Sequence, residues 1–393
     1  MLRPMTGDAT AFFDDREKRA AGWLAAWDGQ GIHRTATPGD HAGAAWLAAE
    51  TASFGAPGAI HPAIHPAIEQ FTLDRFDPVA ASLAIGDEEI AAIPAFDAPS
   101  TDRAGVAGRL GAEIAVAELS PRAVYSGEYE QLRRAGGHRG LVILCAGESP
   151  GMALLNAENF RVPYGAPAIH VASEAAARVL AAKGQGAACR LIAHSRRAPA
   201  AARNVVVRLA DGAPDIAPLV VMTPRSSWWQ STAERGGGLV CWLECLRALV
   251  AAPLSRPVVL TANSGHELGH LGLDDFVARR PGWEETATWL HWGANLGATG
   301  GRLTVMSASD QLRDLAAAEL GRAGQPYATA PKSAVPSGET RDIHRKGGRY
   351  LTLVGSNRLF HLPQDRWPGA VDLAAIGRIA AAASGIAAAL AHG

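Results

Sequence analysis

The stretch from Pro257 to Phe276 constrains this 393-residue chain more than any other. It opens with Val258, Val259 and Leu260, a run of β-branched and apolar residues that is typical of a buried strand. The Ser264-Gly265 pair then breaks the strand, and Glu267 to Arg279 is predicted to be helical. In open α/β sheets, ligands bind just outside the carboxyl ends of strands. The residues that follow this strand are therefore the first candidates for a functional site.

Length and charge narrow the class of protein. A chain of 393 residues can bury a large core, and it is expected to form two domains or one domain with a sizeable insertion. Lys and Arg number 37 against 38 Asp and Glu, so neither a nucleic acid nor an anionic membrane is expected as a partner. The four cysteines form no zinc or disulfide pattern, and the start of the chain carries charges where an export signal needs an apolar run. These features predict a cytoplasmic protein.

The distribution of helix-like and strand-like runs divides the chain into three parts. Residues 1–70 are predicted to form helices that pack on the catalytic-like domain, and residues 71–209 a separate, β-rich insert of short strands with a helix at Ser173 to Lys183. Residues 210–393 alternate strands and helices, which predicts an α/β domain with a mostly parallel sheet between helices. The predicted strands here are Leu219 to Thr223, Val258 to Thr261, Thr288 to Trp292, Leu303 to Ser307 and Tyr350 to Val354; the main helices are Gly238 to Ala251, Asp310 to Gly321 and a packed terminal helix over Ile376 to Ala391.

Two interpretations of a metal site compete at the central stretch. In the first, His266, Glu267 and His270 form H-E-x-x-H, in which a helix presents both imidazoles to zinc and the glutamate is the general base. Gly269 and Gly272 weaken the helix that this motif needs. In the second, Glu267 alone is the ligand, on the loop after a strand, and His266 lies beside the reacting atoms. The buried strand and the Ser-Gly break favour the second interpretation. A capped helix with solvated His and Glu is the alternative without function.

The order of the predicted strands, helices and polar turns resembles that of the zinc aminopeptidase family of clan MH, which also contains the glutaminyl cyclases. SGHELGHLG at 264–272 is similar to the family's Gly-Glu-Glu-Leu-Gly-Leu-x-Gly, and FHLPQDRWPGAVDL at 360–373 is similar to its closing His-Thr-Pro-x-Asp-x-x-x-x-Val-Asp. Residues 122–209 resemble the protease-associated insert of these enzymes. The resemblance implies a zinc-exopeptidase-like α/β fold and a metal-dependent hydrolase.

The family's metal ligands carry over only in part. Pro224 stands where the resemblance places the His of the first metal site, and Asn295 where it places that site's strand Asp. Glu234 corresponds to the bridging Asp of Asp-Asn-x-Ser-Gly, Glu267 to the second-site Glu, and His361 to the second-site His. His266 replaces the general-base Glu. The resemblance therefore implies one Zn²⁺ per chain, with two carboxylates and one imidazole as ligands and an open fourth position.

This set of residues leads to one main hypothesis about function. A zinc bound by Glu234, Glu267 and His361 lowers the pKa of bound water, and His266 moves the proton, so the chain is expected to hydrolyse a small peptide, amide or acyl bond. The alternatives are a catalytically degenerate relative that binds a ligand, and a glutaminyl-cyclase-like acyltransferase. A small peptide or amide is the expected partner, together with a possible second copy of the chain. Whether His270, His291 or Asp342 joins the site stays open, and Arg225 is a candidate for binding a ligand carboxylate.

Overall fold

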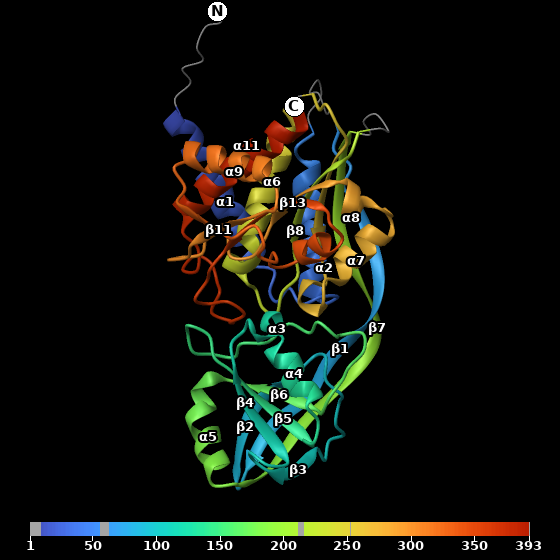
Figure 1. Ribbon diagram of the computed structural model, residues 1–393, viewed down its shortest axis with the longest axis vertical. Helices are drawn as coiled ribbons and strands as arrows, with labels where there is room; N and C mark the ends of the chain where they lie inside the picture. Colours follow the sequence, from blue (N-terminus) through green and yellow to red (C-terminus); the bar gives the residue numbers. More distant parts are fainter. Residues whose placement is uncertain (1–8, 56–62, 211–215, 252, 393) are drawn as a thin grey trace, which may run out of the picture.

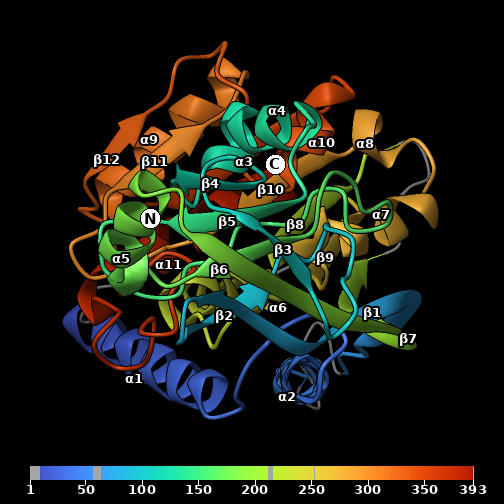
Figure 2. The same ribbon diagram turned by 90° about the horizontal axis from the view of Figure 1, so that it is seen from below.

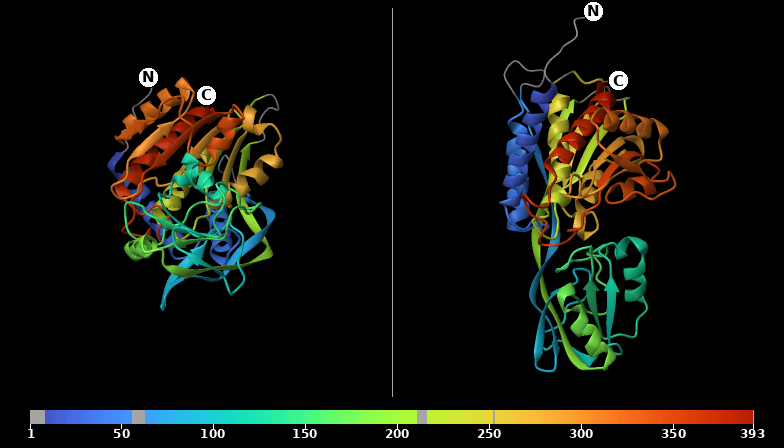
Figure 3. Two further views of the ribbon diagram at one scale, coloured as in Figure 1. Left: turned by 60° about the horizontal axis from the view of Figure 1, so that its bottom comes forward. Right: turned by 90° about the vertical axis from the view of Figure 1, so that its left-hand side faces the viewer.

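The computed structural model describes residues 9–55, 63–210, 216–251 and 253–392. Its two lobes are joined by two long strands, β1 (Ala67–Ile85) and β7 (Ala188–Ala210), which pair antiparallel (Figures 1 and 3). We call residues 86–187, which lie between these strands in the sequence, the lower lobe. The described residues outside 67–210 form the upper lobe. Figure 2 shows the lower lobe in front of the upper one, seen along the molecule.

The upper lobe is built on a mostly parallel sheet, as the alternation of strands and helices predicts. The central strands β8, β9, β10 and β13 run parallel, whereas β7 and β11 pair antiparallel with β9 and β13. Strands covered on both faces need apolar side chains throughout, and every residue of β8 and β9 is buried. The bounds are β8 (Leu219–Pro224), β9 (Val258–Asn263), β10 (Thr288–Trp292), β11 (Leu303–Met306), β12 (Tyr327–Thr329) and β13 (Arg349–Gly355).

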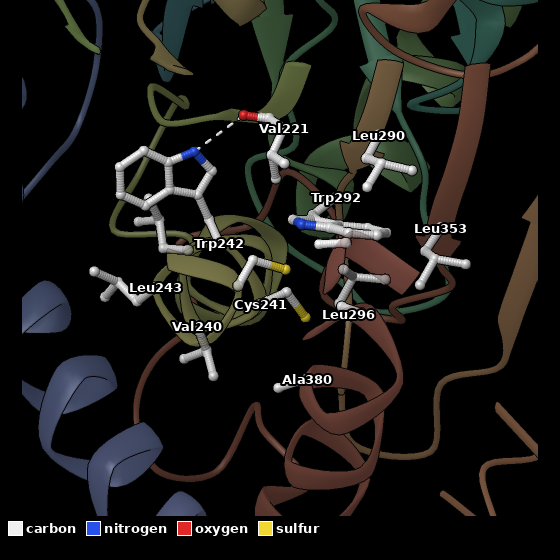
Figure 4. Packing of buried hydrophobic residues seen from close by; sticks show 14 of the residues in the cluster. Val221, Val240, Cys241, Trp242, Leu243, Leu290, Trp292, Leu296, Leu353 and Ala380 are labelled. Carbon is white, nitrogen blue, oxygen red and sulfur yellow. Dashed lines mark hydrogen bonds between the residues drawn. The ribbon is translucent and has the colours of Figure 1, made fainter. Parts of the chain in front are cut away.

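Helices cover both faces of this sheet. On one face α6 packs against α11, which also contacts α9 and α1, and the indole of Trp242 on α6 donates a hydrogen bond to the Val221 carbonyl of β8 at 3.2 Å (Figure 4). On the other face α7 and α10 pack on the strands through Phe276 and Ile343. The bounds are α1 (Ala9–Asp28), α2 (Pro38–Ala52), α6 (Gly237–Val250), α7 (Leu271–Ala278), α8 (Trp283–Thr286), α9 (Asp310–Arg322), α10 (Thr340–Arg345) and α11 (Leu373–His392).

The terminal helix α11 is, within the described part of the chain, the one helix that is long and apolar enough to cross a membrane. Half of the apolar stretch is buried within the protein. Ile376, Ile379 and Ile386 belong to the main hydrophobic core together with α6 and the strands. The helix is therefore the packed terminal helix that the sequence predicts.

The lower lobe has its own core, formed by Val142, Ile169, Val179 and their neighbours between a small sheet and α5. β5 pairs parallel with β4 and β6, and the helix predicted from Ser173 is present as η1 followed by α5. The bounds are β2 (Glu88–Pro94), β3 (Val106–Arg109), β4 (Ile114–Leu119), α3 (Ala123–Ser126), α4 (Glu128–Arg134), β5 (Gly140–Cys145), β6 (Ala168–Val171), η1 (Ser173–Ala175) and α5 (Ala176–Gly184).

The length of β1 and β7 differs from the expectation of short strands separated by turns. β7 runs unbroken through residues 195–203, a segment rich in Arg and Ala with one Pro that carries little strand propensity. Its backbone groups are paired with β1 over the register from Ala67↔Val206 to Ile85↔Cys189, so tertiary pairing outweighs local propensity. Because hydrogen bonding continues from β9 through β7 to β1, the domain boundaries at residues 70 and 209 stay a prediction.

Candidate functional site

The candidate site lies where the parallel strands of the upper lobe end. β8 is followed by Ser226, β9 by His266 and Glu267, and His291 lies near the end of β10. Carboxyl ends of neighbouring parallel strands meet at one edge of a sheet, which brings these residues together as the sequence predicts. This edge faces the lower lobe, with α3 at the boundary between the two lobes (Figure 1). Segment 146–166 of the lower lobe reaches the site, where the Ala157 amide donates to the Glu267 carbonyl at 2.8 Å.

The helix predicted from Glu267 to Arg279 is wrong at its start. A single turn, η3 (His266–Leu268), ends at Gly269 with φ 79° and His270 with φ 63°, and α7 begins only at Leu271. Left-handed residues cannot continue a right-handed helix, so H-E-x-x-H does not present two imidazoles from one helix face. The rings of His266 and His270 nevertheless lie 5.0 Å apart. Burial lowers the pKa of His270, but the 2.6 Å hydrogen bond to Asp342 and the negative charges of Asp342, Glu158 and Glu339 together outweigh it, so the pKa is raised.

Strained backbone gathers around this site. The described residues other than glycine with positive φ are Ala36, Ser231, His270, Asn295 and His361, and each of them borders the site or adjoins a residue that does. Such conformations cost about 1–3 kcal/mol each and persist only where the surrounding structure imposes them. Because strained residues cluster at functional sites, their concentration here makes this edge a candidate functional site.

Glu267 is held by the upper lobe itself. One carboxylate oxygen accepts hydrogen bonds from the Thr35 amide at 2.8 Å and the Thr35 hydroxyl at 2.7 Å, and the other accepts from the Ser226 hydroxyl at 2.6 Å. Burial raises the pKa of Glu267, and these hydrogen bonds oppose the rise. Both oxygens are thus engaged, so Glu267 attaches the segment before α2 to the ends of β8 and β9.

Glu234 and His361 do come together as predicted. Glu234 lies in η2 (Thr232–Gly236), and its Oε1 is 3.6 Å from Nε2 of His361. The Nδ1 atom of His361 is 2.6 Å from the Leu154 carbonyl, which can only accept, so Nδ1 donates there and Nε2 is the ring nitrogen near Glu234. Burial lowers the pKa of His361, while Glu234 acts in the opposite direction. Asp365 fixes the loop by accepting from the amides of Ala233 and Glu234 at 2.8 and 2.9 Å.

Arg235 brings a fixed positive charge into this pair. Its guanidinium is buried, its Nε donates to the Ser226 carbonyl at 2.8 Å, and one terminal nitrogen is 2.8 Å from Oε1 of Glu234. In the Asp-Asn-x-Ser-Gly motif that this segment resembles, the position of Arg235 holds an uncharged Asn. From the sequence, Glu234 and Arg235 could also form an ordinary surface pair, but both side chains are buried.

Glu339 is a second residue that the sequence did not reveal. Its Oε1 lies 3.9 Å from Nδ1 of His266 and its Oε2 lies 3.8 Å from Nε2 of His291, and these four buried atoms have no hydrogen-bond partner among the described residues. Burial raises the pKa of Glu339 to about 7 and lowers that of His291 to about 3. Burial and, after it, the charge of Arg235 lower the pKa of His266. The sequence pattern predicts polar site residues at 342–344 and carries no periodic signal at 339.

The raised pKa of Glu339 gives a first testable expectation. The folded state holds the proton up to about pH 7 and the unfolded chain only to about 4.5, so Glu339 makes the protein less stable as the pH rises between these values. Glu339→Gln removes this loss. Relative to wild type, we expect the variant to gain up to about 3 kcal/mol of unfolding free energy from pH 4.5 to pH 7, at about 1.4 kcal/mol per pKa unit. Urea titrations at both pH values measure the difference, and an unchanged difference would contradict the assignment.

Comparison with known proteins clarifies the fold. No protein-family model and no curated protein matches the sequence. Among solved structures, a zinc aminopeptidase from Bacillus subtilis matches with a TM-score of 0.74 and 14% identity, over 96% of this chain and 95% of that one. A peptidase M28 precursor from Shewanella amazonensis also gives 0.74 and 14%, over 98% and 96%. The aminopeptidase of Aneurinibacillus sp. strain AM-1 gives 0.70 and 13%, over 96% and 94%. This chain has the zinc aminopeptidase fold.

The side chains at the predicted metal site are not arranged to bind the zinc ion that the aminopeptidase fold implies. Across the described ranges, no group of three His, Cys, Asp or Glu side chains is placed to hold a metal. Both oxygens of Glu267 are engaged by Thr35 and Ser226, and the guanidinium of Arg235 competes for the Glu234 oxygen that faces His361. The single-zinc site of Glu234, Glu267 and His361 thus stays a prediction that the geometry does not favour.

Arg225 binds a carboxylate, as proposed, but the carboxylate belongs to the protein. It forms a fully buried ion pair with Asp40 at 2.8 Å and also donates to the Asp40 carbonyl at 2.6 Å. Asp40 in turn accepts from the Ser264 hydroxyl and the Ala36 amide. Arg225 therefore joins α2 to the end of β9 and is not free to bind a ligand.

A cavity of about 350 Å³ opens beside His266, His291 and Asn295. The cavity lies between the two lobes. The lower lobe contributes Tyr125, on α3, and Arg122, directly before it, and the upper lobe contributes the other lining residues. His266 and His291 form part of its wall. A pocket of this size can hold a small organic molecule.

Proposed function

We propose that this protein is a degenerate relative of the zinc aminopeptidases that binds a small peptide-like or amide-like ligand in this pocket without zinc-dependent hydrolysis. The observation that carries the proposal is the contact between Arg235 and Glu234 at 2.8 Å. A guanidinium remains protonated at any pH at which the protein is folded, so this site already contains the cation that balances Glu234. A second cation next to it is opposed by charge repulsion.

The fate of the other predicted groups supports the same conclusion. Burial and the charge of Arg235 lower the pKa of His266, the expected proton carrier, and its Nδ1 lies 3.9 Å from Oε1 of Glu339. Glu267 links Thr35 to Ser226, because its two carboxylate oxygens accept hydrogen bonds from these residues. The pocket and the strained backbone around it are nevertheless retained, and both are features of a binding site.

Metal analysis of the purified protein tests this proposal. We expect substoichiometric zinc in wild type and no tight zinc binding by calorimetry. Arg235→Asn, which restores the uncharged residue of the related motif, should bind zinc more tightly than wild type because it frees Glu234 and His361. The double variant Glu234→Gln with Arg235→Asn is the matched control and should lose that gain.

Two results would overturn the proposal. One is a full equivalent of zinc in wild type that is lost on His361→Ala or Glu267→Ala. The other is turnover of aminoacyl or acyl-amide substrates by the zinc-loaded wild type, with a decrease of about 10²-fold or more on His266→Gln, the contribution typical of a general base. Either result would restore the single-zinc hydrolase hypothesis, or the glutaminyl-cyclase-like one if the product is cyclised.

A further inference from the structure

The charge of the pocket wall is positive. Arg122 from the lower lobe and Arg302, which precedes β11, both line the cavity, and neither side chain forms an ion pair with a residue that the structure describes. The described lining contains no Asp or Glu; Glu339 and Glu234 lie behind the wall. Two unpaired guanidinium groups on facing lobes, with no acid between them, attract a negatively charged group and repel an ammonium.

The inner wall adds neutral polar groups and apolar surface. His266, His291 and Asn295 are nine-tenths or more buried and line the cavity. Nδ1 of His266 and Nε2 of His291 lie 3.9 and 3.8 Å from Glu339 behind the wall, and Oδ1 of Asn295 has no hydrogen-bond partner among the described residues. Phe360, whose ring lies 6.0 Å from the guanidinium carbon of Arg122, and Met306 give part of the wall an apolar character.

We propose that the pocket binds an anionic organic molecule, with a carboxylate or phosphate group between Arg122 and Arg302 and an apolar part against Phe360 and Met306. This inference rests on the proposed ligand-binding function and specifies the charge of the ligand. It also sets the protein apart from an enzyme that must hold a free ammonium group, because an ammonium placed here meets two like charges without a carboxylate. Since the two arginines come from different lobes, the bound anion connects the lobes.

Calorimetry with a matched set of small probes tests the inference on the full-length protein. The probes are N-acetyl-L-phenylalanine, its uncharged amide, L-phenylalaninamide as the cation, and phenyl phosphate. We expect the acid to bind about tenfold or more tightly than its amide, because the charge-assisted hydrogen bonds are lost in the amide. The cation should bind more weakly still. Comparison of the acid with phenyl phosphate identifies which anion the pocket prefers.

Variants locate the binding. Arg122→Gln and Arg302→Gln should each weaken binding of the preferred anion by about tenfold while leaving the weak binding of the amide unchanged. Arg358→Gln is the matched control, because Arg358 is exposed and lies outside this pocket, and it should have no effect. Binding should also weaken as salt increases.

Three outcomes would overturn the inference: equal binding of acid and amide, tighter binding of the cation, or no measurable binding of any probe. An effect of Arg358→Gln equal to that of Arg122→Gln would do the same. The outcome is separable from that of the proposed function. If the wild-type protein carries zinc but binds the acid through Arg122 and Arg302, only the zinc-free proposal is refuted. If the protein carries no zinc and binds the acid and the amide equally, only this inference is refuted.

Discussion

Arg235→Met is expected to lower the free energy of unfolding by about 3–5 kcal/mol, the range for breaking a buried ion pair by removing one partner. Glu234 and Arg235 are both fully or almost fully buried, and the contact between them is 2.8 Å long. Without the guanidinium, the Glu234 carboxylate must either remain charged in a buried position or take up a proton. Urea denaturation followed by circular dichroism at neutral pH measures the loss.

The double variant Glu234→Gln with Arg235→Met is the control for this effect. It removes both charges together, and a buried pair replaced by uncharged groups of similar size often costs little. We therefore expect it to be more stable than Arg235→Met alone. If Arg235→Met costs less than about 1 kcal/mol, the median for an exposed pair, then Arg235 does not supply the balancing charge and the argument against zinc loses its basis.

Glu267→Ala is expected to destabilise the protein by about 3 kcal/mol or more, and to do so whether or not zinc is present. The substitution leaves the Thr35 amide, the Thr35 hydroxyl and the Ser226 hydroxyl without their acceptor in a buried position, and each such group costs about 1–3 kcal/mol. Glu267→Gln keeps the shape and one acceptor oxygen, so it should lose much less.

The measurement is chemical denaturation of wild type and both variants, with and without a chelator and with added zinc. A structural role predicts the same loss in all conditions. If the loss disappears in the presence of chelator, wild type itself was being stabilised by metal through Glu267, and the ligand role inferred from the family resemblance would be correct. This comparison separates the two roles without an activity assay.

Local patterns in the sequence were sufficient for the α/β class and for most elements of the upper lobe. Runs such as Leu219 to Thr223 and Val258 to Thr261 are apolar up to the closing Thr because both faces of a central parallel strand are covered, and the structure contains strands at both. The fold implied by the family resemblance also agrees with the solved structures that the chain matches. The sequence places the candidate residues at the strand ends, and the structure brings these ends together at one edge because chain topology decides where they meet.

The contacts inside the site depended on tertiary structure. Sequence spacing placed His266 and Glu267 next to each other, but only the left-handed turn at Gly269 and His270 decided that one side chain faces the pocket and the other binds Thr35, more than two hundred residues away. Likewise the pairing of β1 with β7 imposed a strand on residues 195–203 that local propensity does not predict.

The sequence by itself thus determined the α/β layers, the apolar runs that form the central strands and the edge at which polar groups collect, since these follow from which residues must leave water. Only the tertiary structure decided what those polar groups do. The burial of Arg235 against Glu234 and of Glu339 between His266 and His291 depends on distances between segments remote in the chain. At these separations, in a site shielded from water, a few ångströms decide which cation balances a carboxylate, because electrostatic interactions there are strong and unscreened.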